Sequence, residues 1–351
     1  MTFVAKPRVH HPLLPTNEIG LTRRDYEGLV STLCAGCGHD SVSAAIVQAC
    51  AELAIPPHLF AKVSGIGCSS KTPSYFLGNS HGFNSVHGRM PSVATGANLA
   101  NRELYCIGVS GDGDSASIGI GQFAHIVRRR INMLYIVDNN GTYGLTKGQF
   151  SATNDKGSTS KKGVPNLYEP IDLVSMALQI GASFVARSFS GDKTQLVPLI
   201  KAGLLHRGFA FIDVISPCVA FNNHNGSTKS YDYLRTRGAS VVTADFIAAG
   251  EEITADYAPG EVETVHMPDG SQLRLRKLDT SYDPHNRAHA LEHVLEAQQE
   301  GEVVTGLLYV DPDASDCHEI LDTVETPLNA LGEEELCPGS DALERINASF
   351  R

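Results

Sequence analysis

Between residues 40 and 235 the chain alternates between short apolar runs and longer stretches with helical spacing of their apolar residues. The short runs are rich in Val, Ile and aromatic residues, which predicts strands. These are Leu59–Ser64, Leu104–Ser110, Met133–Asp138, Ser183–Arg187 and Ala210–Ile215. The helical stretches between them are Ser41–Leu53, Ser92–Asn101, Ile118–Arg130, Ile171–Gln179 and Lys193–His206. Such alternation is typical of a parallel sheet with helices on both faces, so we predict an α/β fold with a doubly wound, mostly parallel sheet.

Two of the predicted strands are nearly uninterrupted apolar runs, YCIGVSG at residues 105–111 and MLYIVDNN at residues 133–140. A strand that is buried on both faces needs no polar alternation. We therefore expect these two strands at the centre of the sheet.

The pattern changes after residue 245. Gln272–Leu278 reads QLRLRKL, with a two-residue alternation, and Val262–His266 precedes it across the turn sequence Met267–Gly270. This arrangement predicts a β-hairpin. A helical pattern at Asn286–Gln299 and an apolar run at Val303–Val310 follow.

Charge divides the chain at the same point. Residues 1–245 carry 22 Lys and Arg against 16 Asp and Glu, a net charge of +6, whereas residues 246–351 carry 6 against 23, a net charge of −17. We therefore expect a domain at 1–245 that holds anions, and a smaller acidic C-terminal extension at 246–351 that packs on a partner chain. Basic runs interleaved with aromatic residues are absent, so binding to nucleic acid is not expected.

Composition also bears on the compartment. No uncharged apolar run approaches the roughly 18 residues of a membrane span, and the first residues, MTFVAKPRVHHPLLP, lack the apolar core of a secretory signal. Eight cysteines without such a signal are expected to be reduced thiols rather than a disulfide framework. We expect a cytoplasmic protein that does not bind membranes.

The strongest chemical signal is a pair of motifs that each follow a buried strand. Gly111–Asp112–Gly113 comes after one strand, and Asn140 follows the next strand, 28 residues after Asp112. A right-handed crossover would bring both motifs to the carboxyl edge of the sheet, where ligands of such folds bind. Carboxylate and amide oxygens suit Mg²⁺, and the glycines allow a diphosphate to approach the backbone. The alternative is that the two motifs are unrelated turns.

Four cysteines form a second candidate site. Cys34 and Cys37 form a C-x-x-C motif, while Cys68 and Cys218 each lie shortly after a predicted strand. All four could meet near the edge that carries Asp112. Four thiolates suit either zinc or an iron–sulfur cluster, and their spacing alone leaves both open. The remaining cysteines follow no metal-binding pattern and are expected to be ordinary small residues; they are Cys50, Cys106, Cys317 and Cys337.

Five motifs in order resemble one enzyme family. They are CAGCGH (34–39), GIGCSSK (65–71), HGRMPSVATGANLAN (87–101), GDGD (111–114) and NNGTYGLTKGQ (139–149). The GDG and NN pair is similar to the motif of enzymes that use thiamine diphosphate (TPP). Together the five motifs resemble the β subunit of a 2-oxoacid:ferredoxin oxidoreductase, most closely the type that uses 2-oxoglutarate, over about Leu33–Tyr231.

The resemblance implies three cofactors. Asp112, the Asn140 side chain and the main-chain carbonyl of Thr142 would hold Mg²⁺ with TPP. Cys34, Cys37, Cys68 and Cys218 would ligate one [4Fe–4S] cluster close to TPP. The residues implied to bind the cofactor are Gly67, Cys68, His87, Gly88, Gly111, Asp112, Gly113, Asp114, Asn140 and Thr142.

Two residues are candidates for catalysis. Lys71 could pair with a substrate carboxylate, although a lysine exposed on a loop is the alternative. His87 belongs to an HGR element that lies beside the cofactor in the family, and a structural histidine is the alternative. Arg128–Arg130 end a helix, where cations interact favourably with the helix dipole; docking of acidic ferredoxin is the alternative.

The reaction implied by the resemblance converts a 2-oxoacid, coenzyme A and oxidised ferredoxin to acyl-CoA, CO₂ and reduced ferredoxin, or runs in reverse. We expect 2-oxoglutarate as substrate, because Lys71, Arg89 and the GSTSKK segment (157–162) offer cations for a second carboxylate. Pyruvate and branched-chain 2-oxoacids remain open. Activation of TPP requires a glutamate from a second α/β domain, so an α subunit and an α₂β₂ assembly are expected.

Two other functions fit parts of the sequence. A TPP-dependent decarboxylase or lyase could use the same cysteines for a structural zinc ion. An iron–sulfur redox sensor would have no use for the GDG and NN motifs, and binding of TPP would exclude it.

Overall fold

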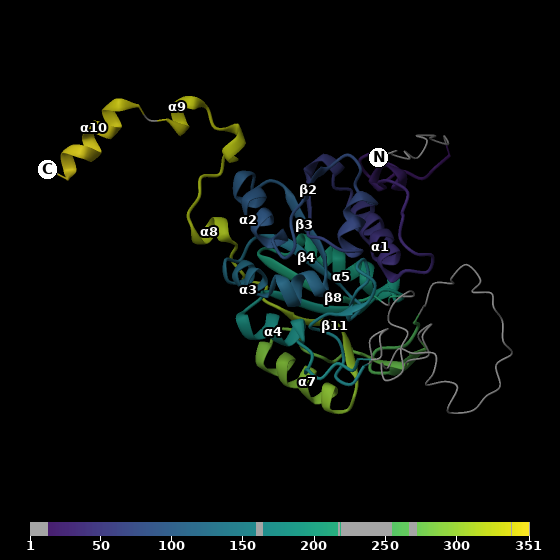
Figure 1. Cartoon of the computed structure of the whole chain (residues 1–351). Coiled ribbons are helices and arrows are strands. Elements are labelled where there is room, and N and C mark those ends of the chain that lie inside the picture. The colour runs from purple at the N-terminus through teal and green to yellow at the C-terminus, as the bar shows by residue number, and fades with distance from the viewer. Residues whose placement is uncertain are drawn as a thin grey trace, which may run out of the picture.

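The computed structural model describes residues 13–158, 164–216, 218, 255–266, 272–337 and 339–350. Among these residues a single large sheet forms the centre of the molecule, in the order β2-β1-β3-β4-β8-β7-β11-β10-β9 (Figure 1). Its strands are β1 (Phe60–Ser64), β2 (His81–Asn84), β3 (Tyr105–Gly111), β4 (Met133–Asn139), β7 (Phe184–Phe189), β8 (Phe209–Ile215), β9 (Val262–His266), β10 (Gln272–Lys277) and β11 (Val303–Val310). The short strands β5 (Thr142–Tyr143) and β6 (Gln149–Phe150) pair antiparallel outside it.

The first six strands of that order, from β2 to β7, run parallel. All five strands expected between residues 40 and 235 lie in this parallel part, within a residue or two of their expected ends. Strands β3 and β4 have parallel neighbours on both sides, and their apolar residues are buried. The predicted mostly parallel α/β sheet is confirmed.

Helices cover both faces of the sheet. The α-helices among the described residues, whether or not they cover the sheet, are α1 (Gly38–Glu52), α2 (Met90–Ala100), α3 (Ile120–Arg128), α4 (Leu173–Ile180), α5 (Lys193–Leu205), α7 (Arg287–Gln299), α8 (Cys317–Ile320), α9 (Glu333–Leu336) and α10 (Ser340–Ser349). Helices α1 and α5 pack together on one face, while α2, α3, α4 and α7 pack on the other. In the second core, Phe123 of α3 packs edge-on against Tyr135, Phe209 and Phe211 of the sheet.

The segment after residue 254 continues the same sheet. Strands β9 and β10 pair antiparallel, as the hairpin pattern predicts, although the turn at 267–270 lies outside the described residues. Strand β11 then pairs antiparallel with β7 and parallel with β10. Pairing with β11 satisfies the backbone groups that β7 would otherwise expose as an edge strand. The expected domain boundary at residue 245 lies outside the described residues and stays a prediction.

The end of the chain leaves the body of the molecule. Figure 1 shows α9 and α10 extending away from the sheet and its helices. Apolar side chains on this arm are exposed, including Leu336, Leu343, Ile346 and Phe350. Among the helices that the structure describes, none has the length and apolar character needed to cross a membrane.

Candidate functional site

Asp112 and Asn140 lie next to each other at the carboxyl edge of the sheet. Strand β3 ends at Gly111 and its parallel neighbour β4 ends at Asn139, so each motif continues directly from its strand. The Asn140 backbone N–H donates to Asp112 Oδ1 at 3.3 Å. The structure thus brings together the two side chains that the spacing of the motifs pointed to.

Asp112 is almost completely buried, with 1% of its surface exposed. Its Oδ2 accepts hydrogen bonds from Thr153 Oγ1, at 2.7 Å, and from Ser151 Oγ. Burial raises the pKa of this carboxyl, and the donor groups around it offset only part of the effect. Sequence reasoning missed Ser151 and Thr153, because they follow the NN motif on a loop whose path the sequence does not show.

Asn140 and Thr142 form the other side of this oxygen cluster. The Thr142 backbone N–H donates to Asn140 Oδ1 at 3.0 Å, which folds the short turn between them. Both residues are buried. Mg²⁺ takes oxygen ligands and usually keeps positions for water and phosphate oxygens, so this set of oxygens suits it.

Asp138 adds a second buried carboxylate that sequence reasoning missed. It lies at the end of β4 with no exposed surface, and neither of its carboxylate oxygens has a hydrogen-bond partner among the described residues. Burial raises the pKa of Asp138 well above the usual value, and the charge of Asp112 makes a smaller contribution in the same direction. Two buried carboxylates side by side favour a cation between or beside them, so the residues present fit a divalent metal ion.

Asp114 connects the GDGD motif to the HGR element. Its Oδ1 accepts from His87 Nδ1 at 2.8 Å and from the Gly88 backbone N–H at 2.9 Å, and its Oδ2 accepts from Ser110 Oγ at 2.8 Å. A Cβ on Gly65 would lie 1.8 Å from Asp114 Oδ2. Asp114 therefore anchors the loop that carries His87, and Gly65 leaves room for its carboxylate. The His87 side chain itself is 44% exposed at the surface of this edge.

The glycines of the GDG motif are packed against the protein itself. A Cβ on Gly113 would lie 2.5 Å from the Tyr143 ring, and the Tyr143 hydroxyl donates to the Gly113 carbonyl at 2.9 Å. A Cβ on Gly111 would lie 2.8 Å from Ser69 Oγ. We expected these glycines to allow a diphosphate to approach the backbone. The structure shows in addition that a larger residue at either position would clash with neighbouring side chains.

The four candidate cysteines gather at the same edge. Gly144 lies between two of them, because a Cβ there would be 3.4 Å from Cys68 Sγ and 3.8 Å from Cys218 Sγ. Burial raises the pKa of Cys37 to about 12, with a further contribution from Cys218. Burial also raises the pKa of Cys68, with a contribution from Cys34. These mutual effects place all four thiols in one neighbourhood.

The donor set of four thiols fits a cluster or a zinc ion, both of which bind thiolates. Within the described ranges no three of the His, Cys, Asp and Glu side chains are already arranged around a metal position. Cys50 and Cys106 are buried in the body of the molecule, Cys317 is buried at α8, and Cys337 is exposed on the arm.

His39 lies between the two groups of candidate ligands. It is 1% exposed, and its Nδ1 is 2.6 Å from Ser216 Oγ and 3.7 Å from Asp138 Oδ2. Its Nε2 is 3.4 Å from Asn140 Nδ2. Burial lowers the pKa of His39 to about 4, so the imidazole is neutral near pH 7. His39 lies in the first turn of α1, and the sequence gives no sign of these contacts.

The candidate cations lie at the surface of this edge. Lys71 is exposed on the turn Ser69–Ser74, directly after Cys68, and its charge acts on the Cys68 thiol. Arg89 is exposed at the start of α2, and Lys161 and Lys162 lie outside the described residues. Roles for Lys71 and His87 in catalysis stay predictions.

The other cationic group lies elsewhere. Arg128–Arg130 lie at the end of α3, which leads the chain from the carboxyl end of β3 to the amino end of β4. Arg129 donates to Thr95 Oγ1 at 2.9 Å and Arg130 to Ser315 Oγ at 3.3 Å. These bonds support a structural role at the edge of the sheet away from the cysteines.

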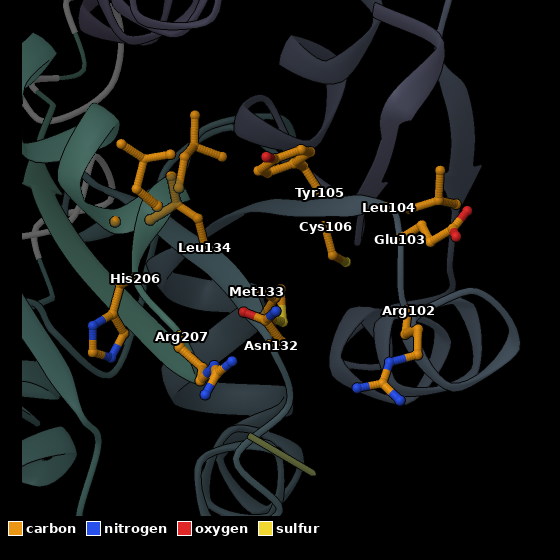
Figure 2. A pocket seen from close by; sticks show the side chains of 13 residues that line it. Arg102, Glu103, Leu104, Tyr105, Cys106, Asn132, Met133, Leu134, His206 and Arg207 are labelled. Carbon is orange, nitrogen blue, oxygen red and sulfur yellow. The ribbon is translucent and has the colours of Figure 1, made fainter. Parts of the chain in front are cut away.

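Figure 2 shows a cavity of about 300 Å³ at that opposite edge, lined by residues at the amino ends of β3 and β4 and the carboxyl end of α5. Its two arginines hold other parts of the chain. Arg102 Nη1 donates to the carbonyls of Thr323 and Val324, at 3.3 and 3.2 Å, and Arg207 pairs with Glu319 at 2.6 Å. The cavity therefore lies away from the candidate site, beside the start of the exposed arm.

Comparison with known proteins gives one family match and a consistent set of relatives. Residues 65–214 match the family described as "Thiamine pyrophosphate enzyme, C-terminal TPP binding domain". The chain is 39% identical over 243 residues to the 2-oxoglutarate synthase subunit KorB of Methanocaldococcus jannaschii, covering 67% of this chain and 88% of that protein. It is 42% identical over 194 residues to 2-oxoacid:ferredoxin oxidoreductase 1, subunit beta, of Aeropyrum pernix.

The match with the Aeropyrum pernix protein spans 55% of this chain and 60% of that protein, which is less than two thirds of its length. A solved structure covers more. The 2-oxoglutarate:ferredoxin oxidoreductase from Magnetococcus marinus, with 2-oxoglutarate, coenzyme A and succinyl-CoA bound, has a TM-score of 0.71 and 29% sequence identity. The superposition covers 93% of this chain and 96% of that one.

Proposed function

The chain belongs to the family of 2-oxoacid:ferredoxin oxidoreductase β subunits, and from this premise we propose that it carries the TPP and iron–sulfur half of such an enzyme. The reaction converts a 2-oxoacid, coenzyme A and two oxidised ferredoxins to acyl-CoA, CO₂, a proton and two reduced ferredoxins, or the reverse. The observation that carries the proposal is that the buried oxygen cluster and the four thiols meet at one edge of the sheet.

The oxygen cluster is suited to hold the diphosphate end of TPP through Mg²⁺. Asp112, the Asn140 amide oxygen and the Thr142 carbonyl would be the metal ligands, and the buried carboxyl of Asp138 lies near Asp112. When bound there, TPP would supply the carbanion-stabilising chemistry that decarboxylation of a 2-oxoacid requires. The match of residues 65–214 to a TPP-binding domain supports this cofactor.

The thiols are suited to hold one [4Fe–4S] cluster. Cys34, Cys37, Cys68 and Cys218 converge, and Lys71 next to Cys68 favours the thiolate form of that residue. A cluster in this position would pass on two electrons singly, which is what ferredoxin accepts. The second candidate function is a TPP-dependent decarboxylase in which the same thiols bind a structural zinc ion. Membership in the oxidoreductase family argues against this function.

2-Oxoglutarate is the proposed substrate. The relative from Methanocaldococcus jannaschii is named for 2-oxoglutarate, and the Magnetococcus marinus enzyme binds 2-oxoglutarate and coenzyme A. In this chain Lys71 and Arg89 are exposed near the site and could pair with the second carboxylate. Pyruvate or a branched-chain 2-oxoacid would leave these cations without that role.

An α subunit is the proposed partner, in an α₂β₂ assembly with ferredoxin as electron acceptor in the cytoplasm. The β-subunit names of the relatives support an α partner. Apolar side chains around the candidate site are exposed in this chain alone, at 45% for Phe83, 69% for Val86, 45% for Ile118 and 47% for Leu145. A partner that covers them would also exclude water from the site.

The proposal is tested by two variants of the complex purified without oxygen. Asp112→Ala should lose bound TPP, because it removes a charged ligand from the metal position, while Glu169→Ala on the exposed surface should keep it. The parent complex should be brown and bleach on reduction. Stoichiometric TPP in Asp112→Ala, or a colourless protein that contains zinc, would overturn the proposal.

A further inference from the structure

His39 is buried between the two candidate cofactor sites and serves as a ligand in neither. Three side chains surround its ring, namely Ser216 after β8, and Asp138 and Asn140 at the end of β4. His39 is only 1% exposed. Burying a polar side chain costs free energy unless the side chain forms hydrogen bonds.

The first step concerns the amide of Asn140. An asparagine side chain has an oxygen that accepts and a nitrogen that donates, and only the oxygen can bind a cation. In the structure Nδ2 faces His39 Nε2 at 3.4 Å, and Oδ1 accepts from the Thr142 N–H at 3.0 Å. The nitrogen of the amide is thus directed at His39, and its oxygen at the turn that carries Thr142.

The second step concerns the tautomer of His39. Nε2 can accept from Asn140 only if the ring proton is on Nδ1. In that tautomer Nδ1–H donates to Ser216 Oγ at 2.6 Å, and Asp138 Oδ2 lies farther away, at 3.7 Å. The contacts to Ser216 and to Asn140 are thus both consistent with the Nδ1–H tautomer, which presents an acceptor to Asn140.

We propose that His39 is a positioning residue that holds the Asn140 amide with its oxygen turned to the metal ion. The inference rests on the proposed function, in which Asn140 is a Mg²⁺ ligand. Groups that orient a metal ligand without touching the metal commonly change metal affinity by about 10–100-fold when they are removed.

A matched pair of substitutions tests this role. The amide of glutamine in His39→Gln reaches about as far as Nε2 and can still accept from Asn140 through its oxygen. The shorter amide in His39→Asn reaches only the position of Nδ1, so it can contact Ser216 but not Asn140. Both variants keep a polar amide at this buried position, and they differ by one methylene group.

The measurement is a titration with Mn²⁺, in place of Mg²⁺, followed by EPR of the free ion. It uses the αβ complex purified without oxygen, in the presence of TPP and without substrate, and the variants are compared at equal iron content. We expect His39→Asn to bind Mn²⁺ about tenfold more weakly than the parent, and His39→Gln to stay within about threefold of it. Equal affinities of the two variants would overturn the inference.

Asp112→Ala separates this inference from the proposed function. If Asp112→Ala binds Mn²⁺ as tightly as the parent complex, the metal site itself is assigned wrongly. If Asp112→Ala loses Mn²⁺ while His39→Asn and His39→Gln bind it equally, the metal site stands and the positioning role of His39 is wrong.

Discussion

Arg187 lies buried on β7 between two carboxylates, and replacing it by methionine would remove the cation that they share. Its Nε donates to Asp213 Oδ2 at 2.9 Å, and its Nη2 donates to Asp172. Asp172 caps α4 by accepting from the Val174 and Ser175 backbone N–H groups. The other oxygen of Asp213 accepts from Asn139, the residue before Asn140, at 3.0 Å. The ion pairs thus connect the sheet, a helix and the strand end that leads into the site.

The magnitude follows from burial. The side chains of Arg187 and Asp213 are only 6% and 2% exposed, and removing one partner of a buried ion pair costs about 3–5 kcal/mol. Lys156 and Glu169 form a pair whose side chains are 57% and 74% exposed, and such a pair contributes about 0–1 kcal/mol. Lys156→Met is therefore the matched control for Arg187→Met.

Urea unfolding followed by circular dichroism measures the difference. With a dependence of about 3 kcal/mol per molar urea, the midpoint of Arg187→Met should fall by about 1 M or more, and that of Lys156→Met by about 0.3 M at most. Equal midpoints for the two variants would refute the assignment of this network to stability.

The pH dependence gives a second check on the same pair. Burial alone would raise the pKa of Asp172, but Arg187 and the N–H donors of α4 outweigh it and hold the pKa below its usual value. A carboxyl with a lowered pKa stabilises the fold above its unfolded pKa of about 4 and loses this effect as the pH falls. In Arg187→Met burial would act on Asp172 without this compensation, so the difference in stability between the parent and the variant should be largest near neutral pH and shrink as the pH falls.

Three further predictions concern the site. Gly65→Ala should weaken TPP binding at least tenfold by calorimetry, because its methyl group would lie 1.8 Å from Asp114 Oδ2. Gly96→Ala has open space around the new methyl group and should bind TPP as the parent does, so equal affinities of the two variants would contradict the packing argument. Cys218→Ser should lose the EPR signal of the reduced cluster and Cys106→Ser should keep it, and a normal signal in the former would break the four-ligand assignment. The chain without an α subunit should show no 2-oxoacid-dependent reduction of viologen, and turnover that does not change on adding the α subunit would exclude a shared active site.

The sequence predicts the parallel part of the fold because its strands are long apolar runs that only a doubly buried position accommodates. It misses β2 (His81–Asn84), whose residues are all exposed and carry no apolar alternation. It identifies Val303–Val310 as an apolar run but not as the neighbour of β7. That antiparallel pairing joins segments more than a hundred residues apart and follows from the open edge of β7 rather than from any local pattern.

The residues of the candidate site also differ in whether the sequence predicts their positions. Asp112 and Asn140 are predictable because each follows a strand, and topology brings neighbouring strand ends together. The burial of Asp138 and His39 is not predictable, because a polar residue beside a motif has the same appearance whether it faces solvent or the interior. Ser151 and Thr153 reach Asp112 only through the path of a loop.

The central claim is tested most directly by an assay of the αβ complex without oxygen, loaded with TPP, Mg²⁺ and iron, that follows viologen reduction with a panel of 2-oxoacids. We predict reduction that depends on coenzyme A, is fastest with 2-oxoglutarate and is lost in Asp112→Ala. A fully loaded complex that reduces viologen with none of the 2-oxoacids, or equally well without coenzyme A, would contradict the account.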